Sequence, residues 1–126
     1  MIDKTTEQLI QEKGLTAQRV TPDDLKANIV SVHFFTAMDG AIGRHEHTGE
    51  PLCPTVKRDK QALNLLTFCV LVLRNGFTVT GESACASPEN FNAEIGRKIA
   101  RENAGQKIWP LMGYHLKQQL AEGGEL

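Results

Sequence analysis

The sequence predicts an α+β fold, and three stretches of the chain indicate it. Residues 67–74 and 77–83 are apolar or threonine-rich runs on either side of Asn75-Gly76, the pattern of an antiparallel β-hairpin. One helical pattern precedes this hairpin, and a long kinked helix is predicted after it, over residues 88–121. An isolated hairpin is unstable in water, so we expect it to pack against these helices.

Size and composition are those of a single soluble domain. The chain has 126 residues, of which 40% are hydrophobic and 23% charged. We expect a polar arm or weak helix over residues 1–20 and one α+β domain over residues 21–126. A net charge of -1 gives no overall attraction to nucleic acid or to an anionic membrane.

The cellular setting expected from the sequence is the cytoplasm. No apolar run approaches the eighteen or so residues that cross a bilayer, and the first residues are polar rather than typical of a secretory signal. The three cysteines, Cys53, Cys69 and Cys85, lack the spacing of a disulfide scaffold, which favours a reducing compartment.

The helix before the hairpin has a clear start signal. The sequence TPDD places a threonine cap, a proline at the first helical position and two acids in the first turn, beginning at Thr21. Leu25, Ile29 and Val32 then share one face, so we expect the helix to continue to about Phe34. The run IVSVHFF also suits a strand, because β-branched and aromatic residues dominate it. The cap favours the helix.

A long loop is predicted over residues 38–60, where glycine, proline and charged residues gather. Within it, RHEHTGEPLC contains side chains that could bind zinc. These are His45, Glu46, His47, Glu50 and Cys53. The spacing lacks the four recognisable ligands of a structural zinc site, so we expect a solvated loop without metal.

The register of the hairpin follows from its turn. A type I′ turn at Asn75-Gly76 would pair Val72 with Val79 and Leu73 with Thr78. The first strand is apolar on both faces, as in strands that are covered on both sides. If the chain supplies no third strand, a partner subunit is the economical source, which leads us to expect a homodimer.

The long C-terminal helix is predicted to start at a Ser87 cap with Pro88 in its first position. An apolar face follows, made of Phe91, Ile95, Ile99, Ala100 and Ala104. We expect a kink or break near Gly105, because Pro110 cannot donate a hydrogen bond within the helix.

The stretch GESAC raises the question of a nucleophile. Ser83 lacks the second glycine and the immediate helix of a nucleophile elbow. Cys85 precedes a helix start, a position that lowers a thiol pKa, but cysteine more often packs in a core. We therefore interpret GESAC as the exit from the hairpin, with Glu82 and Cys85 as the residues to inspect first.

A phosphate-binding site is the second hypothesis. The helix start at Ser87 has the geometry that binds anions, and Arg97 and Arg101 share a face of the helix behind it. Hydrolysis there would need Glu82 or Cys85 close by. The alternative interpretation of these arginines is a solvated face of mixed charge.

An interface or ligand groove is the third candidate, around the expected helix break. Trp109, Met112 and Tyr114 gather there, and aromatic residues with methionine are typical of binding surfaces. The same residues could close the core instead. Leu71 and Leu73 of the hairpin are the other interface candidates.

The stretch from Leu66 to Leu116 resembles a small family of tailed phages and prophages, often called the gene-product-forty-nine family. NGFTVTGESAC, SPENF, EIGRKIARENA and KIWPL carry the resemblance, and TPDDLKANI shows a weaker likeness. The resemblance implies a phage or prophage origin and a place in the bacterial cytoplasm. It implies no activity, cofactor or catalytic residue.

We therefore expect a phage accessory protein that acts as a small non-catalytic binding module toward a host or phage protein. The alternative is a protein that binds a nucleotide, a phosphorylated signal or nucleic acid, with antagonism of a host defence as one such role. No assembled catalytic set, cofactor motif or metal site is visible in the sequence.

Overall fold

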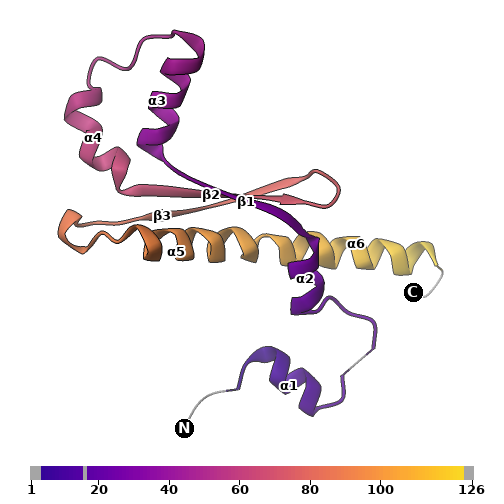
Figure 1. Ribbon diagram of the computed structural model, residues 1–126. Helices are drawn as coiled ribbons and strands as arrows, with labels where there is room; N and C mark the ends of the chain where they lie inside the picture. Colours follow the sequence, from indigo (N-terminus) through magenta and orange to yellow (C-terminus); the bar gives the residue numbers. More distant parts are fainter. Residues whose placement is uncertain (1–3, 16, 124–126) are drawn as a thin grey trace.

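A computed structural model of the chain describes residues 4–15 and 17–123 (Figure 1). It confirms the α+β class, with a three-stranded antiparallel sheet in the order β1-β2-β3. The elements are α1 Thr6–Glu12, α2 Pro22–Asn28, β1 Ile29–Thr36, α3 Ala37–Thr48, α4 Val56–Asn64, β2 Leu66–Leu73, β3 Thr78–Ala84, a short 3-10 helix Pro88–Asn90, α5 Ala93–Gln106 and α6 Ile108–Glu122.

The start of α2 is confirmed, but its predicted extension to Phe34 is wrong. Thr21 and Asp24 form a reciprocal capping box, in which each side chain accepts from the other residue's backbone N–H. The helix ends at Asn28, and the β-branched and aromatic run that follows is β1, paired with β2. Pairing with a neighbouring strand outweighs the continuation of the helical pattern. The chain thus supplies its own third strand, and the reason given for a homodimer no longer holds.

The prediction of a loop over residues 38–60 is also wrong, because much of this stretch is helical. Thr36 and Asp39 form a second capping box at the start of α3. Gly49 ends that helix in the left-handed conformation, with φ of 73°. The glycines taken as loop signals therefore lie within a capped helix or at its end, and α4 follows after a short connection.

The hairpin is confirmed, with a register that differs by one residue from the predicted one. The Leu73 N–H donates to the Phe77 carbonyl at 2.8 Å, so the loop has three residues rather than two. Gly76 has φ of 88°, whereas Asn75 lacks the positive φ that a type I′ turn requires. Val79 consequently lies opposite Leu71 instead of Val72.

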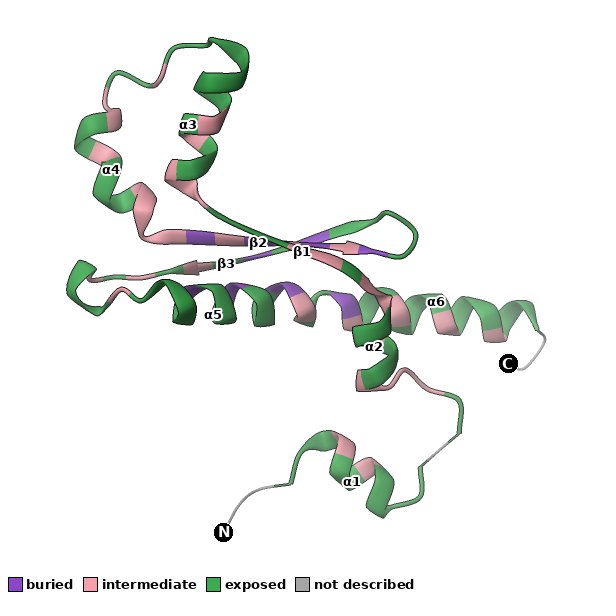
Figure 2. Cartoon of the chain, viewed as in Figure 1, coloured by how far each residue is buried: buried purple, intermediate pink, exposed green. Residues whose placement is uncertain are grey.

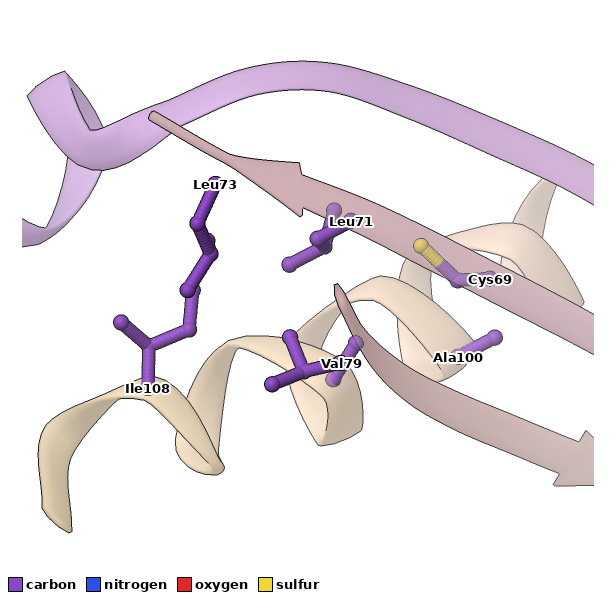
Figure 3. Close-up of a cluster of buried hydrophobic side chains, with 7 residues drawn as sticks. Cys69, Leu71, Leu73, Val79, Ala100 and Ile108 are labelled. Atoms are coloured by element: carbon purple, nitrogen blue, oxygen red, sulfur yellow. The ribbon is translucent and has the colours of Figure 1, made fainter. Parts of the chain in front are cut away.

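Helices α5 and α6 run beneath one face of the sheet, and α5 forms the core with it (Figures 1 and 3). The core contains Cys69, Leu71, Leu73, Val79, Ala100, Ala104 and Ile108. At Gly81 the backbones of β3 and α5 meet, because an added Cβ would lie 2.2 Å from the Ala100 carbonyl oxygen. This close approach explains a strand glycine and two helix alanines at the contact.

The predicted start and apolar face of the C-terminal helix need correction. Ser87 does not cap it; Asn92 does, by accepting from the Ile95 N–H at 3.0 Å. Ala100 and Ala104 of the predicted face are buried as expected, but Ile95 and Ile99 are exposed, because the small side chains of α5 are the ones that fit against the sheet. The break is confirmed: α5 ends at Gln106, and Pro110 lies in the first turn of α6.

Candidate functional site

The sheet face opposite α5 is the largest feature without a covering element. Opposite residues of paired strands share a face, so the register identifies its members. We call it the open face: Ser31, His33 and Phe35 of β1, Phe68, Val70 and Val72 of β2, and Thr78, Thr80 and Glu82 of β3. In contrast to the alternating buried residues of β2, none of these nine is buried (Figure 2).

An aromatic pair lies toward one end of the open face. The rings of Phe35 and Phe68 stack with centroids 5.5 Å apart and planes inclined by 29°. Helices α3 and α4 project from this end of the sheet, on the side away from α5 (Figure 1). Val70 and Val72 continue the apolar strip toward the hairpin loop, where no helix covers them in the described part of the chain.

The outer strand β1 is an edge of the sheet, and its pairing with β2 is irregular between Ile29 and Ser31. Its eight residues, IVSVHFFT, contain no lysine, arginine, acid or proline. Val30 is 63% exposed, and Phe34 and Phe35 are each more than a third exposed. An apolar edge of this kind can pair with another strand.

The GESAC residues occupy the end of β3 and the turn after it, as expected for the exit from a hairpin. Glu82 lies on the open face opposite Phe68, and its carbonyl accepts from the Asn103 amide at 2.9 Å. The Cys85 thiol donates to the Ser87 carbonyl at 3.1 Å. Within the described residues, no hydrogen bond joins Ser83 or Cys85 to a histidine.

The phosphate site was predicted at a helix start at Ser87, but Ser87 precedes the short 3-10 helix Pro88–Asn90 and α5 begins at Ala93. The Ser87 hydroxyl donates to the Glu89 carboxylate, and this hydrogen bond lowers the pKa of Glu89. Arg97 and Arg101 are exposed on α5, beside the buried Gly96 and Ala100. Their role in binding a ligand stays a prediction.

The interface candidates divide between core and surface. Leu71 and Leu73 are buried under α5 at 0% and 4% exposure, so they are not available to a partner. Met112 packs against the same core, and Trp109 is half-buried. Tyr114 is 75% exposed, and any role of this residue at an interface stays a prediction.

The residues considered for zinc lie on α3 and the connection after it. His45 Nδ1 is 2.7 Å from the Glu50 carbonyl oxygen, and Cys53 is hydrogen-bonded to the Thr55 hydroxyl at 3.2 Å. That bond lowers the pKa of the Cys53 thiol. No group of three or more potential ligands is close enough to hold a metal ion among the described residues.

A groove of about 640 Å³ lies between α2, the hairpin loop and α6, and sequence reasoning missed it. Leu73 and Met112 contribute to its wall, and Arg74 and His115 supply polar groups. The Arg74 backbone N–H donates to the Asn28 carbonyl at 3.0 Å, which joins the hairpin loop to α2. The groove depends on three elements far apart in sequence, so no local motif could have indicated it.

Similarity to known proteins identifies the family of this chain. None of the helices in residues 4–15 and 17–123 is long and apolar enough to cross a membrane. No curated protein and no solved structure matches the chain. A family model does match, over residues 20–120, which is well over half of the sequence and includes all three strands. The chain therefore belongs to the Phage protein (N4 Gp49/phage Sf6 gene 66) family.

Proposed function

We propose that this phage-family protein is a non-catalytic binding module whose open face receives an amphipathic helix of a host or phage protein. The carrying observation is the uncovered sheet face with its aromatic pair and adjoining valines. Contiguous exposed apolar surface rimmed by polar residues is typical of protein interaction sites.

The dimensions of the sheet favour one helix as the occupant. Three strands about 4.8 Å apart span about 10 Å between the outer two. This width equals the diameter of one α-helix with its side chains, about 10 Å. Helix α5, continued by Ile108 at the start of α6, covers the opposite face of the sheet, and the open face has the same width.

The composition of the open face specifies the chemistry of that helix. Its apolar stripe would lie on Phe35, Phe68, Val70 and Val72, with the stacked rings as the anchor. Glu82 is the acid of this face and favours a lysine or arginine beside the stripe. Threonines along β3 would form the polar rim.

We further propose that two copies associate through the edge of β1, as an accessory protein in the host cytoplasm. The support differs from the missing strand that first suggested a dimer. It is the exposed Val30 and the uncharged sequence of β1, which can extend the sheet by pairing with its own copy. The open face would remain accessible in such a dimer.

The open face is tested by capture from host lysate, with and without phage infection. The bait proteins are the wild type, Val70→Glu and, as a matched control, Ile95→Glu, which makes a similar change on the exposed side of α5. Circular dichroism first establishes that all three are folded. We expect a stoichiometric protein bound by the wild type and by Ile95→Glu, and lost with Val70→Glu.

Equal capture by both glutamate variants would refute the open face as the site, and capture by none would refute the binding module. If a protein is captured, a synthetic peptide with the sequence of its amphipathic helix is titrated into the wild-type protein and its binding is measured by calorimetry. For the dimer, sedimentation velocity compares the wild type with Val30→Lys. A wild type that is monomeric at every concentration would refute pairing through β1.

A further inference from the structure

We propose that the groove between α2, the hairpin loop and α6 binds a small amphiphilic anion, with an apolar body and one acidic head group. This site is separate from the open face, and its argument does not depend on the protein-binding function. A volume of about 640 Å³ lies in the range of small-molecule sites, about 300–1,000 Å³.

The apolar part of the groove is built from side chains that the fold leaves incompletely covered. Leu73 reaches into the core, but Phe77 is 55% exposed and Leu111 is 39% exposed. Met112 lies between core and groove. A ligand with an apolar body would cover these side chains and remove their surface from water.

The polar rim favours a negatively charged head group. Arg74 forms no salt bridge with another residue in the described part of the chain, and its side chain is exposed at the groove. His115 and Gln119 add hydrogen-bond donors on α6. The guanidinium is the group best suited to a carboxylate or phosphate.

The other charged groups of the groove are already engaged. Arg19 makes two hydrogen bonds of 2.8 Å to the Glu7 carboxylate. Asp24, the acid of the rim, accepts from the backbone N–H of Thr21, which lowers the pKa of Asp24. Asp24 keeps its negative charge, so Arg74 is the cation of the groove that has no carboxylate partner among the described residues, and an anion is its complement.

Decanoate and 1-decanol form a suitable pair of probes, because they share a ten-carbon chain and differ in charge. The full-length protein is titrated with each below its aggregation limit and followed by ¹H–¹⁵N NMR. We expect decanoate to shift the amides around Arg74, Phe77 and Leu111. We expect 1-decanol to bind about fivefold more weakly, the order of a partly solvated charge interaction.

Two arginine variants complete the test. Arg74→Gln should weaken decanoate about fivefold without changing 1-decanol, whereas Arg97→Gln on α5 should change neither. Equal binding of the two probes, an unchanged decanoate affinity in Arg74→Gln, shifts confined to the open face, or no saturable binding would each overturn the proposal. Val70→Glu should leave decanoate binding intact. The proposal of this site and the proposal of the protein-binding open face are therefore tested independently of each other.

Discussion

Replacing Gly81 with alanine tests the closest contact in the fold. The added Cβ would lie 2.2 Å from the Ala100 carbonyl oxygen and 2.3 Å from the Ala104 backbone nitrogen. These are backbone atoms within α5, so no side-chain rotation can relieve the overlap. Because ordinary contacts begin at 3.4 Å, β3 and α5 would have to separate by about 1 Å.

Such a separation weakens the whole core between sheet and helix. Leu71 and Ile108 are fully buried there, and a gap of this size loses a large share of their dispersion contacts. We expect Gly81→Ala to lower the free energy of unfolding by about 3 kcal/mol, at the upper end for overpacking. The melting temperature should fall by roughly 10 °C.

Urea denaturation followed by circular dichroism measures this change. The matched control is Gly113→Ala in α6, where an added Cβ meets nothing within 4 Å. Alanine is the better helix former, so this variant should gain about 0.5 kcal/mol. If Gly81→Ala unfolds within 0.5 kcal/mol of the wild type, roughly the scale of a neutral surface change, the close contact inferred between β3 and α5 is refuted.

Three further perturbations address other elements. Gly76→Ala places a side chain at φ of 88° and should cost about 1 kcal/mol in urea unfolding; an unchanged midpoint would contradict the three-residue loop. Thr36→Ala removes the α3 capping box and should cost about 1 kcal/mol, seen as faster amide exchange confined to α3. The hydrogen bond from Arg19 lowers the pKa of Glu7 from 4.5 to about 2, so the ion pair stabilises α1 fully above pH 4.5 and is lost toward pH 2. The protection factors of the α1 amides, which correct for the intrinsic pH dependence of exchange, should fall over that range in the wild type but not in Arg19→Gln.

The Thr21 cap was a reliable guide in this sequence, whereas the predicted Ser87 cap and the predicted ends of elements were not. Thr21 with Asp24 correctly predicts where α2 begins, because the capping hydrogen bonds are local. Nothing local ends the helix at Asn28. The change to β1 depends on hydrogen bonds to β2, a strand nearly forty residues later, and the sequence pattern IVSVHFF is compatible with both structures.

The open face could not be predicted from the sequence for the same reason: it depends on pairing between strands that are distant in the sequence. Recognising the open face required the register of β2 against both neighbours, and a one-residue difference at the Gly76 turn moves Val79 to the other face. A single glycine in the left-handed conformation therefore decides which side chains face α5. The sequence shows that β2 is apolar on both sides, but it cannot show that only one side is covered.

The packing of α5 shows why side-chain size misled the prediction of its buried face. The predicted face correctly included Ala100 and Ala104 but also the exposed Ile95 and Ile99, and it omitted Gly96, which faces the sheet. Small side chains allow the two backbones to approach, and the contact is then made by the strand itself at Gly81. The open face carries no comparable glycine at its centre. Its phenylalanines and valines would contact the side chains of a bound helix at the ordinary distance between a helix and a sheet. A helix held by such side-chain contacts, without a close approach of the two backbones, is a partner that can dissociate.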